Sequence, residues 1–408
     1  MNAVEPFTAE RAGVKGRPIR LLVTAVGYPS DQLVAGTFHQ DQFRLIAEAG
    51  FDVTVVVPTP WVPRPLSGIH RWRKYVAAPE RQTDGPITIL RPRYLTVPRE
   101  NAWFVPDLSQ YLAVRRLDLP RPDLVHGFHV LPLGAVAARL ARRWRVPYLT
   151  TAMGDDVNVY PHLRRRNLRL LKDVVSEAAV TFATGETLAR ATERLTGCRA
   201  ENLPIGVSAT RFRNLPSREA ARARLNLPHD RIIVLYVGRM VPGKGIDELA
   251  AALDDLRDLS MLCVAIGEGP CRSTLEAKSN ALCLGARSPS EVDLAMAAAD
   301  VFVLPSHSEG LPTVLVEAAL ANLAIVTTDA PGCIDLAADG RALVVPVGDA
   351  PALARALRQA AADPDVGRKR ACAMRAHVEA FCTLEINTAR LIEHYRRVLE
   401  NAAGWAGP

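Results

Sequence analysis

Short runs of apolar, mostly β-branched residues alternate along the chain with longer segments whose apolar positions recur at helical spacing. Such runs predict buried strands of parallel sheets, and the segments between them predict the helices that cover those sheets. In the first half, strands are expected at residues 20–26, 51–57, 87–91, 123–128, 147–153, 180–184 and 202–207. In the second half, strands are expected at residues 232–237, 261–266, 281–284, 301–304, 324–328 and 343–345. The strand and helix order predicts an α/β fold of two doubly wound, Rossmann-like domains.

The length of 408 residues also favours two domains, because a single core rarely grows so large. Residues 1–18 are expected to be a leader, 19–207 the first domain and 208–383 the second. Residues 384–408 are expected to form a helix that returns to the first domain. In doubly wound sheets, ligands bind at the carboxyl ends of the strands. We therefore expect the two domains to face each other across a ligand cleft.

Residues 299–320 form the most informative stretch, because a strand, a turn and a helix follow one another there. Pro312 suits the first turn of the helix, and Glu317 is the only ionisable side chain between Gly310 and Thr328. A carboxylate in such an apolar helix needs a partner. One interpretation is a ligand site, in which Glu309 and Glu317 bind hydroxyls beside phosphates at the helix N-terminus. The other is that Glu309 is a solvated loop acid and Glu317 pairs with a core arginine.

A second candidate site follows the first strand of the second domain. Residues 238–245 read Gly-Arg-Met-Val-Pro-Gly-Lys-Gly, which places the cations Arg239 and Lys244 in one glycine-bearing loop ahead of a helix. A guanidinium and an ammonium group in this arrangement suit a diphosphate. A surface turn with two basic residues would have the same sequence.

Residues 305–318 resemble the nucleotide-sugar motif of the retaining glycosyltransferases of GT-B architecture, in which two glutamates stand seven residues apart after an apolar strand. This large family (glycosyltransferase family four) includes bacterial mannosyl-, glucosyl- and N-acetylglucosaminyl-transferases. The resemblance spans residues 19–398. It implies that Glu309 orients the donor sugar, that Glu317 binds the ribose, and that Arg239 and Lys244 bind the diphosphate. The donor-binding residues that it implies are Gly36, Arg239, Lys244, Gly285, Arg287, Glu309, Gly310, Leu311, Pro312, Thr313 and Glu317.

The family also implies histidines on the acceptor side, and this chain departs from that pattern. The strand at 123–128 usually ends in His-x-His, but Phe128 occupies the second position and His129 is displaced by one residue. Met153 replaces the histidine that many members carry before a glycine. We expect His129 to join Glu309, Arg239 and Lys244 as the catalytic residues. A histidine at a strand end is as often only structural.

Several features concern the acceptor and the location of the protein. Residues 28–30, 36–38 and 154–158 resemble the branch that acts in teichuronic acid and other cell-surface polysaccharide synthesis, which implies a lipid-linked saccharide acceptor. The first 210 residues carry 28 Lys and Arg against 19 Asp and Glu, and residues 163–175 are strongly basic. Such a surface suits an acidic acceptor or an anionic membrane face, although a solvated helix face is the more common meaning. The irregular, aromatic-rich segment 58–107 is either an acceptor-recognition surface or a variable loop.

Other classes of protein are less consistent with the chain. No zinc-finger, helix-turn-helix or RNA-binding signature accompanies the basic half, so nucleic acid is not expected as a partner. The Gly-x-Gly-x-x-Gly fingerprint of dinucleotide oxidoreductases is absent. No apolar run reaches the ~18 residues of a membrane span, and the seven cysteines contain no Cys-x-x-Cys pair, which favours a reducing cytoplasm.

The sequence therefore predicts a retaining hexosyltransferase that uses a nucleotide-diphosphate sugar as co-substrate. Neither a cofactor nor a metal ion is expected, because no Asp-x-Asp metal motif accompanies the candidate donor site. The acceptor is expected to be a carbohydrate, a lipid-linked saccharide or a small molecule. Two alternatives stay open: a nucleotide-sugar 2-epimerase of the same architecture, and a non-catalytic nucleotide-sugar-binding partner. The location is expected to be cytoplasmic, with peripheral contact at the inner membrane face as a further option.

Overall fold

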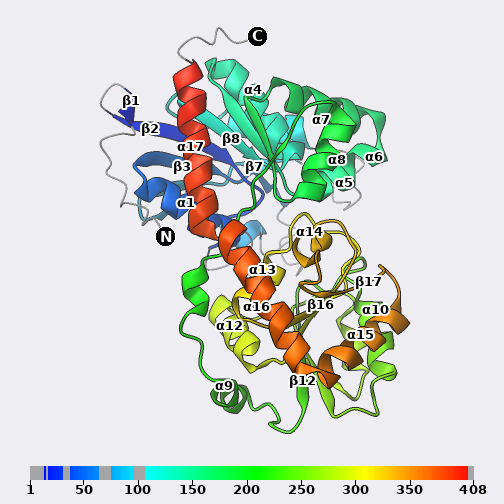
Figure 1. Cartoon of the computed structure of the whole chain (residues 1–408). Coiled ribbons are helices and arrows are strands. Elements are labelled where there is room, and N and C mark those ends of the chain that lie inside the picture. The colour runs from blue at the N-terminus through cyan, green and yellow to red at the C-terminus, as the bar shows by residue number, and fades with distance from the viewer. Residues whose placement is uncertain (1–12, 15–16, 31–36, 64–74, 96–105, 403–408) are drawn as a thin grey trace. The chain divides into compact units, whose positions relative to one another are not determined.

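The computed structural model describes residues 13–14, 17–30, 37–63, 75–95 and 106–402 of the chain (Figure 1). The chain divides into two compact units, the first made of Met1–Ile205 with Glu385–Pro408 and the second of Gly206–Leu384. Val207 belongs to the second unit because it forms a β-bridge with Thr383 and its N–H donates to the Cys382 carbonyl. The two units are described separately below.

The first unit is built on one large, mostly parallel sheet. Its strand order is β11-β10-β9-β8-β2-β3-β6-β5, with β1 paired to β2, and only β1 and β5 run antiparallel among the described strands. The strands are β1 (Gly13–Val14), β2 (Arg17–Thr24), β3 (Phe51–Val56), β5 (Arg81–Asp84), β6 (Ile87–Leu90), β8 (Leu124–Phe128), β9 (Tyr148–Ala152), β10 (Val180–Ala183) and β11 (Glu201–Asn202). The strand order reverses direction between β2 and β8, which is the switch point of this doubly wound sheet.

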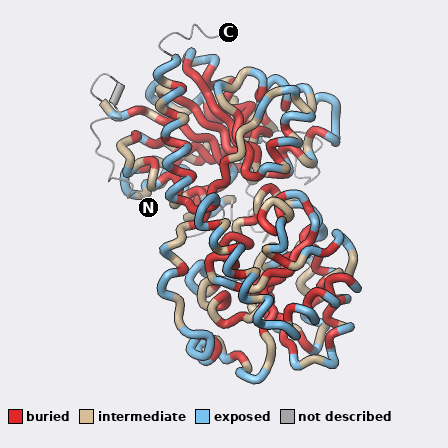
Figure 2. Tube along the Cα trace, in the orientation of Figure 1, coloured by how far each residue is buried: buried red, intermediate tan, exposed pale blue. Residues whose placement is uncertain are grey.

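Helices cover both faces of this sheet. They are α1 (Thr37–Glu48), α3 (Asp107–Val114), α4 (Ala135–Trp144), α5 (Asp155–Asn158), α6 (Tyr160–Leu163), α7 (Arg165–Glu177), α8 (Glu186–Thr196) and α17 (Leu384–Ala402). Successive residues of β2 serve opposite faces, so that Leu22 joins the core under α4 and α7 whereas Leu21 and Val23 join the core under α1 and α17. Figure 2 shows the strands of each unit as a buried layer between helices with exposed outer faces.

The C-terminal helix α17 is part of the first unit, although it follows the second in sequence. Leu391, Ile392 and Tyr395 pack in the same core cluster as Phe51 and Val53. The Tyr395 hydroxyl lies 2.6 Å from His126 Nδ1. The contact ties the last helix to the centre of the first sheet.

The irregular segment 58–107 contains short strands of its own. The strand expected at 87–91 is confirmed as β6, which pairs with β3 and β5, and β4 (Thr59–Pro60) pairs with β7 (Arg93–Tyr94). Arg91 is buried, and its guanidinium donates to the Tyr28 carbonyl at 3.0 Å, so this cation supports the core and does not face an acceptor. Of the aromatic residues expected to form an acceptor surface, Trp72, Trp103 and Phe104 lie outside the described residues, whereas Trp61 is exposed and Tyr75 and Tyr94 are partly buried.

The second unit contains a six-stranded sheet in the order β14-β13-β12-β15-β16-β17, with every described pair parallel. The strands are β12 (Ile232–Val237), β13 (Met261–Ile266), β14 (Ala281–Gly285), β15 (Val301–Leu304), β16 (Ala324–Thr328) and β17 (Leu343–Val345), so all six expected strands are confirmed. The helices include α9 (Arg218–Leu225), α10 (Ile246–Asp254), α11 (Arg272–Glu276), α12 (Pro289–Ala298), α13 (Thr313–Leu320), α14 (Cys333–Ala337), α15 (Ala350–Ala362) and α16 (Pro364–Phe381). The order places β12 beside β15 at the switch point, where a Rossmann-like sheet binds its ligand.

Candidate functional site

The loops that follow β12, β13, β15 and β16 are joined to one another at the carboxyl edge of the second sheet. The Met240 N–H donates to the Glu268 carbonyl at 2.9 Å, which joins the loops after β12 and β13. The His307 N–H donates to the Gly243 carbonyl at 2.9 Å, and the Glu309 N–H donates to the Pro331 carbonyl at 3.0 Å. These bonds hold residues from separate parts of the sequence as one surface.

Two glycines allow these loops to approach so closely. Gly245 has a φ of 69°, and a Cβ atom there would lie 2.0 Å from the Pro305 carbonyl oxygen. Gly332 has a φ of 79°, and a Cβ atom there would lie 2.4 Å from the Gly310 carbonyl oxygen. A side chain at either position would separate the loop after β15 from its neighbours. The two glycines therefore determine where Glu309 and Gly310 lie.

Lys244 and Glu309 meet at the centre of this surface. The Lys244 Nζ atom lies 2.5 Å from Glu309 Oε1, and the two side chains are 20% and 14% exposed. Lys244 stands two residues before α10, and Glu309 stands four residues before α13. The pair thus places an ammonium group against a carboxylate at the carboxyl edge of the sheet.

Arg239 lies in the same loop as Lys244. Its backbone carbonyl accepts a hydrogen bond of 2.9 Å from the buried Tyr236 hydroxyl, and its side chain is exposed. The guanidinium forms no ion pair with any residue in the part of the chain that the structure describes. Arg239 is therefore available for an anionic ligand at this edge of the sheet.

Residues 310–313 lead from this loop into α13. Gly310 and Pro312 are buried, whereas Leu311 and Thr313 are partly exposed. Pro312 is the N-cap of α13 and makes no side-chain hydrogen bond, so the cap residue does not satisfy the first N–H groups of the helix. Such N–H groups and the positive end of the helix dipole attract anions.

Glu317 has a protein partner, in agreement with one of the two interpretations of the sequence. Arg211, in η4 (Ala209–Phe212), donates from Nη1 to Glu317 Oε1 at 3.0 Å. The same guanidinium donates from Nη2 to Asp293 Oδ1 at 2.6 Å. Burial raises the pKa of Glu317, and the Arg211 charge opposes that rise. The sequence did not identify Arg211 or Asp293, because each is distant from Glu317 along the chain.

Gly285 and Arg287 lie at the end of β14 and are linked to the site less directly. The Gly267 N–H donates to the Gly285 carbonyl at 2.9 Å, which joins Gly285 to the loop after β13. Arg287 Nη1 lies 3.3 Å from Glu291 Oε1, in the first turn of α12. Glu291 also forms a capping box with Ser288. Gly36 lies outside the described residues.

His129 belongs to the first unit, where it follows β8 with a φ of 73°. Its Nδ1 atom is buried and forms no hydrogen bond with the described residues. The buried Asp156 carboxylate accepts hydrogen bonds from the N–H groups of Val130 at 2.7 Å, Gly154 at 2.8 Å and Met153 at 3.0 Å. Asp156 thereby fixes the turn in which His129 lies. The sequence singled out residues 154–158 by resemblance but did not indicate this role of Asp156.

The two positions where the histidines of the pattern are replaced differ in burial. Phe128 is buried, and its ring stacks on His126 with a centroid distance of 4.2 Å. His126 is buried between Tyr395 and Thr151, and burial lowers its pKa to about 3. His126 is therefore a neutral structural residue. Met153 is partly buried at the end of β9.

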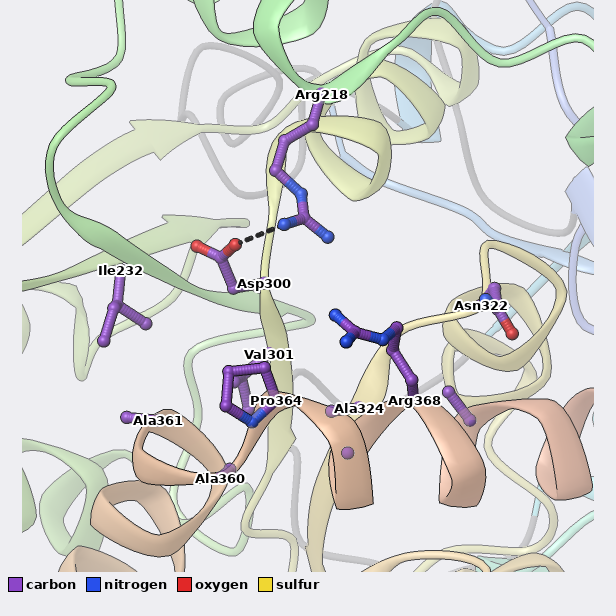
Figure 3. A pocket seen from close by; sticks show the side chains of 12 residues that line it. Arg218, Ile232, Asp300, Val301, Asn322, Ala324, Ala360, Ala361, Pro364 and Arg368 are labelled. Atoms are coloured by element: carbon purple, nitrogen blue, oxygen red, sulfur yellow. Dashed lines mark ion pairs between the residues drawn. The ribbon is translucent and has the colours of Figure 1, made fainter.

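A pocket of about 170 Å³ lies at the opposite edge of the second sheet (Figure 3). Ile232, Val301 and Ala324, the first residues of β12, β15 and β16, contribute to its lining. In Figure 3, Arg218 points toward Asp300, and the ion pair between them spans 2.9 Å. The pocket is thus at the amino ends of the strands and is not part of the site at their carboxyl ends.

A metal-binding cluster and a membrane-spanning helix are both absent from the described ranges of the chain. Within those ranges, no three His, Cys, Asp or Glu side chains are arranged to hold a metal ion. No helix there combines the length and the apolar character that crossing a bilayer requires.

The sequence matches two known families. Residues 217–377 match the family described as Glycosyl transferases group 1, and residues 35–206 match the Glycosyl transferase 4-like domain. TuaC of Bacillus subtilis, assigned as a glycosyltransferase to teichuronic acid biosynthesis, is 36% identical over 343 residues, 83% of this chain and 87% of TuaC. A D-inositol 3-phosphate glycosyltransferase of Streptomyces scabiei is 32% identical over 317 residues, 67% of this chain and 69% of that protein.

Solved structures resemble the chain over nearly its whole length. The sucrose-phosphate synthase of Thermosynechococcus elongatus has a TM-score of 0.77 at 21% identity and covers 94% of this chain and 99% of its own. Anabaena Alr3699/HepE, solved in complex with UDP-glucose, has a TM-score of 0.70 at 16% identity. It covers 93% of this chain and 100% of its own. At these identities the likeness establishes the fold, which is that of GT-B glycosyltransferases.

Proposed function

Because the chain belongs to the group 1 glycosyltransferases of GT-B fold, we propose that it transfers a hexosyl group from a nucleotide-diphosphate sugar to an acceptor with retention at the anomeric carbon. The observation that carries this proposal is the Lys244–Glu309 pair beside the N-termini of α10 and α13. It offers a phosphate-binding cation and a sugar-binding carboxylate 2.5 Å apart. The reaction requires no cofactor in this proposal.

The donor is bound by groups from several loops of the second unit. Arg239, Lys244 and the first N–H groups of α13 bind the diphosphate, and Glu309 binds hydroxyls of the sugar. Glu317 binds the ribose, and the loop of Gly285 and Arg287 holds the nucleobase. On donor binding, Lys244 exchanges part of its contact with Glu309 for a phosphate oxygen. Glu309 is then free to accept from the sugar.

The chemical step in this proposal needs no protein nucleophile. The bond between the anomeric carbon and the diphosphate oxygen breaks, and the acceptor oxygen bonds to the same face of that carbon. The acceptor's hydroxyl proton passes to the departing phosphate oxygen. Arg239 and Lys244 neutralise the leaving group without a metal ion, and each such donor is worth roughly 3–4 kcal/mol in comparable sites. His129 acts on the acceptor side, where its Nδ1 atom has no protein partner among the described residues.

The proposed acceptor is a lipid-linked polysaccharide precursor at the cytoplasmic face of a membrane. The assignment of TuaC to teichuronic acid biosynthesis supports this choice. A second support is the surface of α6 and α7, where Leu163 is 47% exposed beside the exposed cations Arg164, Arg165 and Arg169. Apolar and basic side chains on one surface favour binding to anionic lipid.

A binding screen followed by product analysis tests the proposal. The protein is first tested by thermal shift, without metal, against UDP, GDP, ADP, dTDP and their sugars. A ligand at about a hundred times its dissociation constant stabilises a protein by about 2.7 kcal/mol. NMR then follows the sugar that shifts the melting temperature: transfer or hydrolysis with retained anomeric configuration supports the proposal. An isomerised donor would indicate a 2-epimerase instead, and a bound but unchanged donor would indicate a non-catalytic partner.

A further inference from the structure

Arg211 connects two helices of the second unit through their acidic side chains. Its Nη2 and Nε atoms lie 2.6 and 3.4 Å from the two oxygens of Asp293 in α12. Its Nη1 atom lies 3.0 Å from Glu317 Oε1 in α13. The side chains of Arg211, Asp293 and Glu317 are 27%, 17% and 18% exposed. The guanidinium is thus held from one side by Asp293 and presents its remaining edge to Glu317.

The contact leaves Glu317 able to bind a ligand. Arg211 engages only Oε1, and Oε2 accepts no hydrogen bond from the residues that the structure describes. A carboxylate has about four acceptor positions, so most of its capacity remains. A vicinal pair of hydroxyl groups, such as the 2′- and 3′-hydroxyls of a ribose, suits that remaining capacity.

The charge on Glu317 depends on this arrangement. The charged side chains that shift its pKa are Arg211 from η4 and Asp293 from α12. Burial and Asp293 raise the pKa of Glu317, and Arg211 lowers it. Without Arg211, both remaining influences would favour the neutral acid, which accepts hydrogen bonds less strongly than a carboxylate.

We infer that Arg211, held by Asp293, is a positioning residue that orients Glu317 toward the ribose hydroxyls of the donor nucleotide. This inference rests on the proposed donor site. It assigns to Arg211 a role in nucleotide selection, because hydroxyl groups of a ribose distinguish it from a deoxyribose.

The competing explanation is that Arg211 only stabilises the fold as a structural brace, because its ion pairs with Asp293 and Glu317 also connect η4, α12 and α13. The two explanations differ in what they predict for ligand binding. A brace affects the melting temperature of every variant, but it leaves the preference for ribose and the pH dependence of binding unchanged. A positioning residue alters both.

The experiment measures binding by calorimetry between about pH 6 and about pH 9. The probes are UDP, GDP and ADP with their 2′-deoxy counterparts. The variants are Arg211→Met, Arg211→Lys, Asp293→Asn and Glu317→Gln. The control is Arg218→Met, which removes an arginine from its ion pair with Asp300 at the other edge of the same unit (Figure 3). Asp300 keeps its ion pair with Arg222 in this variant.

We expect wild-type protein to prefer the ribonucleotide, and its change of affinity with pH, which includes protonation of the probe's terminal phosphate near about pH 6, is the reference for the variants. Arg211→Met should bind it roughly 10- to 100-fold more weakly near neutral pH, the size expected for hydrogen bonds to a charged group. Its affinity should recover as the pH rises, because Glu317 then ionises without Arg211. Arg211→Lys should keep the wild-type pH profile, and Glu317→Gln should lose the ribose preference at every pH.

Three outcomes would overturn the inference. If Arg211→Met does not fold, nucleotide binding by Asp293→Asn is measured in its place. An unchanged ribose preference in Asp293→Asn would then show that Asp293 and Arg211 do not position Glu317. If Arg211→Met folds and binds like Arg218→Met, the arginine is only a brace. If wild-type protein binds none of the nucleotides, the proposed donor site fails and the inference fails with it.

Discussion

Lys244 and Glu309 form an ion pair between the loops that follow β12 and β15, with Nζ 2.5 Å from Oε1. The two residues are 65 positions apart in the sequence. Their loops are fixed independently of the pair, by the hydrogen bond from His307 to the Gly243 carbonyl and by the close approach of Gly245 to Pro305. The pair is therefore held ready by the backbone, and its two charges are available to a ligand that can exchange with them.

Removing either member of this pair should affect catalysis far more than folding. Lys244→Ala and Glu309→Ala are expected to lower kcat by roughly 10²- to 10³-fold, because each removes a group that acts on developing charge or on the sugar. The matched control is Lys278→Ala. Lys278 is also 20% exposed and lies 2.6 Å from a carboxylate, that of Asp254. Normal turnover in Lys244→Ala, with a loss of melting temperature like that of the control, would contradict the site assignment.

Gly245 should not tolerate a side chain. Gly245→Ala places a Cβ atom 2.0 Å from the Pro305 carbonyl oxygen, so the loop after β15 must move and nucleotide binding should be lost. Gly340→Ala is the control, because Gly340 has a similar φ of 74° but open space around it. The control should cost only about 1–2 kcal/mol of stability, the strain of an L-residue in this region. Equal nucleotide affinities in the two variants would show that the close approach is unimportant.

The buried His126 should make the protein less stable as the pH falls. Its pKa is lowered to about 3 in the folded state and is about 6.5 in an unfolded chain, so the unfolded state binds more protons between these values. Stability should fall by about 1.4 kcal/mol per pH unit below about pH 6.5. Burial also lowers the pKa of His39, so urea unfolding of the wild type should be compared with that of His126→Gln. Between about pH 7 and about pH 5, the free energy of unfolding should fall less in His126→Gln than in the wild type. An equal fall in both proteins would refute the assignment of His126 as a neutral buried residue.

Asp156 should be necessary for the turn that carries His129. Asp156→Asn replaces one acceptor oxygen by a donor that faces backbone N–H groups, and it is expected to cost about 1–3 kcal/mol. Because the turn at His129 would relax, turnover should fall as well. Asp155→Asn, at the exposed neighbouring position, is the control and should behave like the wild type. Unfolding curves give the stability of each variant, and steady-state kinetics give its turnover. An Asp156→Asn protein with the stability and turnover of the wild type would contradict this role.

The basic surface of α7 should direct the protein to anionic lipid. Replacing Arg164, Arg165 and Arg169 by alanine is expected to weaken binding to phosphatidylglycerol-containing vesicles, at about 1 kcal/mol per basic residue. A control with the same change in charge replaces exposed basic residues of α15 and α16, namely Arg355, Arg368 and Lys369. Sedimentation with vesicles at low and high salt separates the two variants. Equal binding by both would indicate attraction to net charge alone.

The sequence by itself determined the six strands of the second unit. Strands such as β12 and β15 are buried on both faces, so they appear as continuous apolar runs that no other element of this length explains. The start of α12 is also marked locally, because the helix begins at Pro289 behind a Ser288–Glu291 capping box. The resemblance also named Arg239, Lys244, Glu309 and Glu317 as one set.

Only the tertiary structure decided how these residues are paired. Arg211 and Glu317 are 106 positions apart, and no local pattern relates a guanidinium in one loop to a carboxylate in a later helix. The same is true of Asp156, whose buried carboxylate holds a turn 26 residues earlier. Periodicity reports which side of an element is buried, because burial follows from the local repeat of the backbone. Partners across loops follow from the order of the strands in the sheet, and that order is a property of the whole folded unit.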